Sequence, residues 1–121
     1  MYCSILKSKL HAARVTEAVR DYEGSLTIDP DLMDAVKLSP YEKILVSNLE
    51  NGNRFETYAI PGKRGSGVIG LNGATTHLGA VGDRIIIFSF CLLSPAEVAS
   101  HRPLVLVLDA NNRPIGGLRT L

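Results

Sequence analysis

The sequence predicts a mainly β protein: a small closed barrel of six or seven short strands with two short helices. Eleven glycines and six prolines separate short apolar runs at close intervals, which is typical of many short strands. Turn pairs such as Asn51-Gly52 lie between these runs. A closed sheet would leave no unpaired strand edges, so a barrel suits this set of strands.

The expected strands are short apolar runs that end at turn residues. They are residues 3–10, 25–28, 43–49, 54–60, 68–71, 84–93 and 104–108. Asn51-Gly52, between the third and fourth runs, is the pair most typical of a two-stranded hairpin. The run at 84–93 is the most hydrophobic, but its apolar stretch is only about half of what a membrane span requires.

Two segments carry the signals of a helix start. Asp29-Pro30-Asp31 combines an N-cap aspartate, a first-turn proline and an acidic first turn. Apolar residues within 32–36 would then form the buried side of a short helix. Ser94-Pro95-Ala96-Glu97 has the spacing of a capping box. We therefore expect a short helix at each segment.

Length, charge and cysteine content limit the possible function classes. The 121 residues suit one domain, residues 1–121. Lys plus Arg is 13 and Asp plus Glu is 12, so the formal charge is +1, which argues against nucleic acid as a partner. Cys3 and Cys91 lie in apolar runs and are expected to be reduced thiols. With no signal peptide and no membrane span expected, we predict a cytoplasmic protein.

One motif suggests a cofactor site but has a simpler interpretation. Residues 65–70 match the spacing G-x-G-x-x-G, which in dinucleotide sites is followed by a helix. Here the residues after the second glycine favour a strand, and Asn72-Gly73 would stop a helix, so a flexible turn is the better interpretation. No metal site is expected, because the three histidines are not spaced like ligands: His11, His77 and His101.

A further pattern runs in order along nearly the whole chain. It consists of Lys9-Leu10-His11, Val15-Thr16, Tyr22-Glu23-Gly24-Ser25, Ile28-Asp29, Asn51-Gly52, Arg54-Phe55, Thr57-Tyr58-Ala59-Ile60, Arg64-Gly65-Ser66, Asn72-Gly73-Ala74, His77 and Val81-Gly82-Asp83. In this order and spacing it resembles the pyruvoyl-dependent aspartate 1-decarboxylases of pantothenate biosynthesis. Tyr22-Glu23-Gly24-Ser25 is similar to the processing site of that family.

The resemblance implies a fold, an assembly and a reaction. The fold would be a six-stranded double-psi β-barrel, assembled as a homotetramer. The reaction would convert L-aspartate to β-alanine and carbon dioxide for pantothenate and coenzyme A biosynthesis. The chain would cut itself between Gly24 and Ser25 into a β chain, 1–24, and an α chain, 25–121. The cofactor would be a covalent pyruvoyl group made from Ser25, without metal or pyridoxal phosphate.

The residues can carry this processing chemistry. Ser25 Oγ would attack the carbonyl of Gly24 and form an ester, which β-elimination would split to leave dehydroalanine. Hydration and loss of ammonia would then give the pyruvoyl group. A strained turn at Gly24 could drive the first step by about 1–3 kcal/mol. By resemblance, Thr57 activates the bond and Asn72 belongs to the processing site.

Turnover and substrate binding follow from the same resemblance. The pyruvoyl ketone would form a Schiff base with aspartate and accept the electrons left by carbon dioxide. Tyr58 matches the family's proton donor, and a phenol is protonated at neutral pH. Arg54 can hold one carboxylate through its planar fork. The remaining substrate-binding residues that the resemblance implies are Lys9, Thr57, Gly73, Ala74 and Thr75, the last at a position where alanine is commoner.

Several alternatives stay open at this stage. In a regular strand Arg54 and Tyr58 share one face and Thr57 lies on the other, so the three could share a pocket only if the strand bends, bulges or ends there, or if the site lies between subunits. His11 and Tyr22 either assist processing or simply pack. Maturation is spontaneous or uses a helper protein. The competing functions are a non-catalytic binding module and a pyruvoyl decarboxylase of another amino acid.

Overall fold

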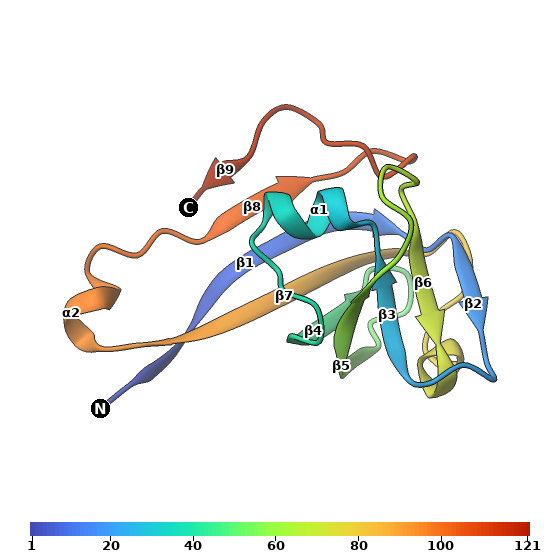
Figure 1. The fold of residues 1–121 in the computed structure, drawn as a ribbon, viewed down its shortest axis with the longest axis horizontal. Helices are drawn as coiled ribbons and strands as arrows, with labels where there is room; N and C mark the ends of the chain where they lie inside the picture. Colours follow the sequence, from blue (N-terminus) through green and yellow to red (C-terminus); the bar gives the residue numbers. More distant parts are fainter.

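The computed structural model describes residues 1–121 and is mainly β, as predicted (Figure 1). Its strands are β1 Cys3–Arg14, β2 Glu17–Val19, β3 Ser25–Ile28, β4 Lys43–Asn48, β5 Arg54–Pro61, β6 Ile69–Asn72, β7 Arg84–Leu93, β8 Leu104–Val107 and β9 Arg119–Thr120. Its helical segments are α1 Pro30–Ala35, the 3-10 segment η1 Gly73–His77, and α2 Pro95–Val98. None of the helices is both long and apolar enough to cross a membrane.

The strands form one mixed sheet in the order β2-β6-β3-β5-β4-β7-β1-β8-β9. β3 runs parallel to β5 and antiparallel to β6, and β1 runs parallel to β8 and antiparallel to β7. β2 and β9 are the two edges, so the sheet is not closed and the expected six-stranded closed barrel is not confirmed. The strand count was too low because β2 and β9, with three and two residues, are too short to show an alternating pattern.

One face of the sheet supplies the hydrophobic core, a cluster of 18 buried residues. The strand members include Leu10 in β1, Leu26 and Ile28 in β3, Ile44 and Val46 in β4, Ala59 in β5, Ile69 and Leu71 in β6, and Ile85 and Ile87 in β7. Within a strand these residues are two apart, as side chains on one face must be. Because strands far apart in the sheet order share one cluster, the sheet curves around its core.

A buried aspartate joins α1 to the loop before β6. Asp29 caps α1, accepting from Asp31 N at 2.9 Å, and it also accepts from Gly65 N at 3.0 Å and Gly67 N at 2.8 Å. The glycine-rich motif therefore binds a carboxylate of its own chain, and β6 follows it instead of a helix. Burial alone would raise the pKa of Asp29, but these backbone donors and the nearby Arg113 lower it below its ordinary value.

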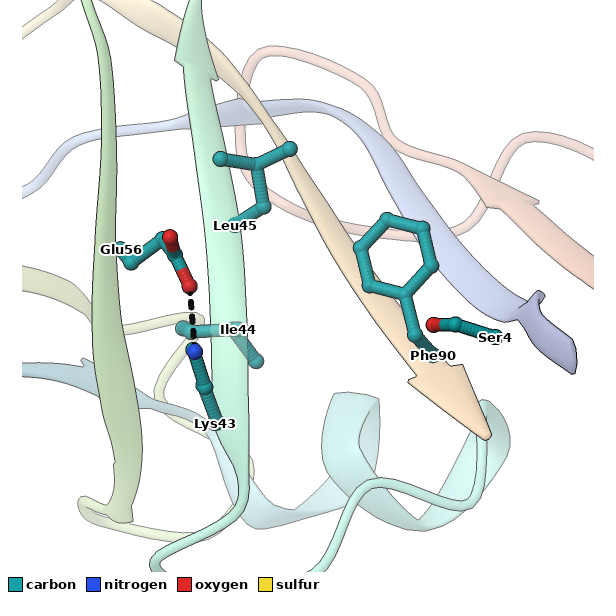
Figure 2. Close-up of a pocket in the computed structure, with 6 residues that line it drawn as sticks. All are labelled: Ser4, Lys43, Ile44, Leu45, Glu56 and Phe90. Atoms are coloured by element: carbon teal, nitrogen blue, oxygen red, sulfur yellow. Dashed lines mark ion pairs between the residues drawn. The ribbon is translucent and has the colours of Figure 1, made fainter. Parts of the chain in front are cut away.

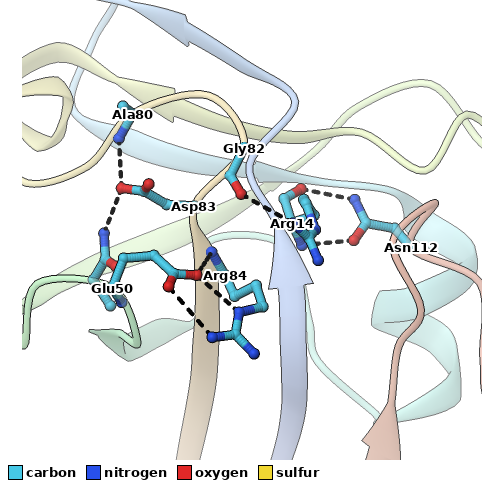
Figure 3. A network of polar contacts seen from close by, with 8 residues as sticks. Arg14, Glu50, Ala80, Gly82, Asp83, Arg84 and Asn112 are labelled. Atoms are coloured by element: carbon cyan, nitrogen blue, oxygen red, sulfur yellow. Dashed lines mark hydrogen bonds and ion pairs between the residues drawn. The ribbon is translucent and has the colours of Figure 1, made fainter.

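A polar network ties the C-terminal segment to the end of β1 (Figure 3). Asn112 accepts from Arg14 N at 2.7 Å and donates to Arg14 O at 2.8 Å, so its side chain pairs with β1 much as a strand would. Its amide also donates to Gly67 O at 2.7 Å. Nearby, Glu50 pairs with Arg84 at 2.8 Å. The bond between Asn112 and Gly67 holds the loop that leads into β6, and the Glu50–Arg84 pair holds the turn after β4 to the start of β7.

The local predictions are mostly confirmed. β4 and β5 form the hairpin around Asn51-Gly52, with Gly52 in the left-handed region at φ +77°. The capping box at the start of α2 is complete, since Ser94 and Glu97 bond each other's backbone. β1 runs further than predicted, to Arg14, because a register shift between Leu10 and Ala13 re-aligns it with β7.

Candidate active site

Ser25 begins β3 and is buried, with 1% of its surface exposed. It pairs across the sheet with Asn72, the last residue of β6. The Asn72 amide Nδ2 donates to Ser25 Oγ at 3.0 Å and to Thr27 Oγ1 at 2.8 Å. Ser25 Oγ in turn donates to the Glu23 carbonyl at 3.2 Å. The structure therefore brings Ser25 and Asn72 together, and the amide fixes the position of the hydroxyl.

The peptide before Ser25 lies directly against Gly73. A Cβ at Gly73 would lie 2.9 Å from Gly24 Cα, 2.9 Å from Tyr22 O and 3.0 Å from Gly24 N. Gly73 also has a φ of +63°, so both the space and the conformation at this position favour glycine. Gly24 itself has no neighbouring atom within 4 Å of an added Cβ. The predicted cleavage point therefore has Gly73 packed against it, while the direction of a Cβ at Gly24 is open.

Tyr58 shares a pocket of about 300 Å³ with Ser25. In the parallel ladder of β3 and β5, Leu26 pairs with Ala59, so one residue earlier Ser25 lies beside Tyr58. The pocket is lined by Tyr22, Glu23, Ser25, Tyr41, Tyr58, Ile60 and Pro61. A serine, phenols and one carboxylate therefore surround the space next to the predicted cleavage point.

Thr57 and Arg54 do not line this pocket. The ladder between β4 and β5 runs without a register shift from Lys43–Tyr58 to Ser47–Arg54, so β5 does not bulge. Thr57 is two residues from both Phe55 and Ala59, so it shares their face of the strand, which is the face toward the core. It therefore lies on the face opposite Tyr58. Arg54 shares the face of Tyr58 but lies four residues away, roughly 13 Å along a strand.

Lys9 lines a different pocket, of about 210 Å³, together with His11, Val105, Arg119, Thr120 and Leu121. In the sheet order, β4 and β7 separate β1 from β5, so Lys9 and Arg54 are about three strand spacings, roughly 14 Å, apart. Burial is the largest cause that lowers the pKa of His11, and the positive charges of Lys9 and Arg119 lower it further. One protomer alone therefore does not bring Lys9 and Arg54 to Ser25.

The three residues after Asn72 form the start of η1. Thr75 is buried, and its Oγ1 donates to the Asn72 carbonyl at 2.7 Å. The departure from alanine at position 75 therefore adds a hydrogen bond that holds Asn72. None of Gly73, Ala74 and Thr75 lines the pocket of Ser25 through its side chain.

The largest hollow lies elsewhere on the sheet and contains none of the predicted site residues. It has a volume of about 390 Å³ and is lined by Ser4, Lys43, Ile44, Leu45, Glu56 and Phe90 (Figure 2). Its two charged side chains, Lys43 and Glu56, pair with each other at 2.7 Å, so it offers no net charge to a ligand. The pocket of Ser25 is the better candidate for chemistry.

Comparison with known proteins shows the family of the chain. Residues 1–115 match the family model described as "Aspartate decarboxylase". The chain belongs to the aspartate decarboxylase family. The match covers every candidate residue from Lys9 to Thr75, so the resemblance seen in the sequence is confirmed.

Several members of the aspartate decarboxylase family are similar to this chain over most of their length. A protein of Syntrophobacter fumaroxidans named aspartate 1-decarboxylase is 57% identical, over 92% of this chain and 90% of the relative. One of Bacillus subtilis with the same name is 54% identical, over 93% and 89%. One of Shouchella clausii is 51% identical, over 99% and 94%.

The structure of this family member adds pocket residues that sequence reasoning missed. Tyr41 lines the pocket of Ser25 because the turn before β4 bonds to β5, with Tyr41 N donating to Ala59 O at 2.7 Å. Glu23 enters the pocket as the neighbour of Gly24. No sequence signal marked Tyr41, because its place depends on a contact between two segments. Tyr22, whose role was open, is now placed in the pocket wall.

Proposed function

We propose that the chain is a self-processing, pyruvoyl-dependent aspartate 1-decarboxylase that converts L-aspartate to β-alanine and carbon dioxide for pantothenate biosynthesis. Membership of the aspartate decarboxylase family supports the reaction. The observation that carries the proposal is the geometry at Ser25. Its hydroxyl is held by Asn72, its neighbour Gly24 lies against Gly73, and both Ser25 and Tyr58 face one pocket.

The processing step uses Ser25, Gly24 and Asn72. Ser25 Oγ attacks the Gly24 carbonyl carbon, its proton passes to the Ser25 nitrogen, and the C–N bond between Gly24 and Ser25 breaks, which leaves an ester. Loss of the Ser25 α-proton then breaks the bond between Cβ and Oγ, so that residues 1–24 leave as a carboxylate and residue 25 becomes dehydroalanine. Addition of water and loss of ammonia convert dehydroalanine to the pyruvoyl group at the start of residues 25–121. Asn72 positions the hydroxyl through the 3.0 Å bond. We retain Thr57 as an activating residue, although it lies on the other face of β5, so its part would be indirect unless β5 changes during processing.

The site fits a pyruvoyl group at position 25. The Ser25 side chain is small and buried, it lies next to the pocket, and Asn72 Nδ2 is a donor suited to an oxygen at this place. When present, the group supplies a ketone that withdraws electrons from the α-carbon of aspartate as carbon dioxide leaves. Tyr58 then returns the proton to that carbon from its phenol. No metal or pyridoxal phosphate is needed for this chemistry.

Substrate binding requires more than one protomer. Aspartate carries two carboxylates, and Arg54 and Lys9 are the proposed cations, with the backbone of Gly73, Ala74 and Thr75 beside them. Their separation within one chain supports a homotetramer in which a neighbouring subunit completes each site. β2 and β9 leave open sheet edges that fit such an assembly. A helper protein for maturation is a further proposed partner.

We also propose that the strands around the core form the six-stranded double-psi barrel of the family, with β2 and β9 added at its edges. The parallel pairs β3–β5 and β1–β8 support it, since each needs a crossover connection. The shared core along the sheet also supports it. We place the enzyme in the cytoplasm, an environment suited to the free thiols of Cys3 and Cys91.

The test is the intact mass of the purified protein under denaturing conditions, followed by an assay with L-aspartate. We expect two fragments divided after Gly24, with the larger one lighter by one ammonia than a serine-led chain, and release of β-alanine. Ser25→Ala is the control and should give neither. An uncut wild-type chain that stays whole on prolonged warming, and releases no β-alanine with a maturation partner added, would favour a barrel that only binds. Faster turnover of glutamate would change the assigned substrate.

A further inference from the structure

Tyr41 has a backbone conformation that large side chains avoid. Its φ is +68°, in the left-handed region that favours glycine and asparagine. Burial of the tyrosine ring does not offset the free-energy cost of this conformation, because 76% of the residue is exposed. Packing in the core therefore does not explain why an aromatic residue occupies this position.

The turn is held in place by contacts on three sides. Tyr41 N donates to Ala59 O at 2.7 Å, and Ala59 N donates to Glu42 O at 3.0 Å. Glu42 accepts from Ser39 N at 3.0 Å and from Lys7 Nζ at 2.7 Å. These bonds prevent the turn from relaxing, which is the condition under which a strained residue persists. Strained residues of this kind are concentrated at functional sites.

Tyr41 is one of the residues that line the pocket shared by Ser25 and Tyr58. It enters from the turn before β4, while Tyr58 enters from β5 and Ser25 from the start of β3. Tyr41 is thus contributed by a segment separate from those of Ser25 and Tyr58. An asparagine would adopt the same backbone at lower cost but would replace the large ring with a shorter side chain.

We propose that Tyr41 is a substrate-binding residue, whose ring forms one wall of the aspartate pocket and sets the affinity for L-aspartate. This inference rests on the proposed function. The wall keeps the small dicarboxylate beside Ser25 and limits the room available to longer amino acids. Tyr41 takes no part in cleavage, because its backbone hydrogen bond goes to Ala59 in β5 and no hydrogen bond joins it to the Gly24–Ser25 peptide.

The experiment uses Tyr41→Asn, Tyr41→Phe and the control Lys37→Asn in the full-length processed protein. Lys37 also has a positive φ, +58°, and an exposed side chain, but it lines none of the three cavities. Both asparagine variants should relieve strain and raise the melting temperature by about 2–5 °C. We measure intact mass, melting temperature, and kcat and KM for L-aspartate.

Tyr41→Asn should cleave normally and keep kcat within twofold, while its KM rises at least fivefold. Tyr41→Phe should keep the wild-type KM, and so should Lys37→Asn. A more stable protein that binds substrate less well is a result that a purely structural role would not give. A KM for Tyr41→Asn within twofold of wild type, or an equally raised KM for Tyr41→Phe, overturns the inference alone. A wild type that neither cleaves nor decarboxylates overturns it together with the proposed function.

Discussion

Ser25 shows how one residue can be prepared for chemistry by its neighbours across a sheet. Its hydroxyl has little freedom, because Asn72 donates to it and it donates to the Glu23 carbonyl. Asn72 is itself held, since Thr75 Oγ1 bonds its carbonyl. This chain of bonds places the proposed nucleophile beside the Gly24–Ser25 peptide, against which Gly73 packs.

Replacing Asn72 tests this arrangement. Asn72→Ala removes the donor to Ser25 Oγ and Thr27 Oγ1, so we expect self-cleavage to slow by roughly 10²-fold, the usual effect of losing one positioned donor. The fraction cleaved is followed over time by intact mass. Thr76→Ala is the control in the same segment, since its hydroxyl bonds only Gly73 O. Cleavage at the wild-type rate in Asn72→Ala would contradict the role of this amide.

Tyr58 is the second residue with a separable role. Tyr58→Phe removes only the phenolic hydroxyl and with it the proton donor, so the chain should still cut itself, while kcat for L-aspartate falls by about 10²–10⁴-fold. The measurement pairs intact mass with β-alanine release. Tyr41→Phe, at another phenol of the same pocket, should keep its kcat. Equal losses in both variants would show that the pocket needs its hydroxyl groups in general and not a proton from Tyr58.

At the scale of elements, the carboxylate of Asp29 connects α1 to the loop before β6. Three backbone N–H groups bond to it in a buried place. That loop leads directly into β6, whose last residue is Asn72. The glycine-rich sequence, whose spacing resembles that of a nucleotide site, therefore binds Asp29 and helps to position β6. Asn72, at the end of β6, is positioned with it.

Asp29→Asn should lower the free energy of unfolding by about 1–3 kcal/mol, because an amide nitrogen would face N–H donors. The folded state lowers the pKa of Asp29, so its stabilising effect is complete above the ordinary aspartate range, about pH 4, and is lost as the pH falls through the lowered value. Urea unfolding across pH 2–7 measures both. Asp31→Asn, at an exposed ion pair with Arg64, should cost less than about 1 kcal/mol. A difference between Asp29→Asn and wild type that does not shrink in acid would refute the explanation.

At the scale of the whole molecule, the proposed substrate residues lie too far apart for one protomer. Ser25 and Tyr58 share a pocket, whereas Arg54 is roughly 13 Å along β5 and Lys9 lies beyond two further strands. Strand alternation places Thr57 on the face opposite Arg54 and Tyr58, and β5 has no bulge that would bring the three side chains to one side. We therefore propose that neighbouring subunits bring these residues together.

Mixed assemblies test a site shared between subunits. Ser25→Ala and Lys9→Ala should each be inactive alone. When the two are co-expressed in equal amounts, sites that take Ser25 from one subunit and Lys9 from its neighbour should regain about a quarter of wild-type activity. The hybrid is purified through two different tags and assayed with L-aspartate. Continued inactivity of a confirmed hybrid would place both residues in the same protomer.

The sequence by itself determined much of the local structure and the family, and it supplied the candidate site residues. The hairpin at Asn51-Gly52, the cap at Asp29 and the capping box at Ser94 depend on neighbours in the chain, so their signals are local and were read correctly. The ordered matches around Gly24-Ser25 likewise identified the family.

Only the tertiary structure decided what depends on contacts between distant segments. The strand β2 exists because it pairs with β6, and β9 because it pairs with β8. Four features follow from contacts between distant segments: the unbroken register of β5 with β4, the separation of Lys9 from Arg54, the carboxylate bound by Gly65 and Gly67, and the place of Tyr41. The physical reason is that register and curvature come from the shared core, to which each strand contributes only a few residues.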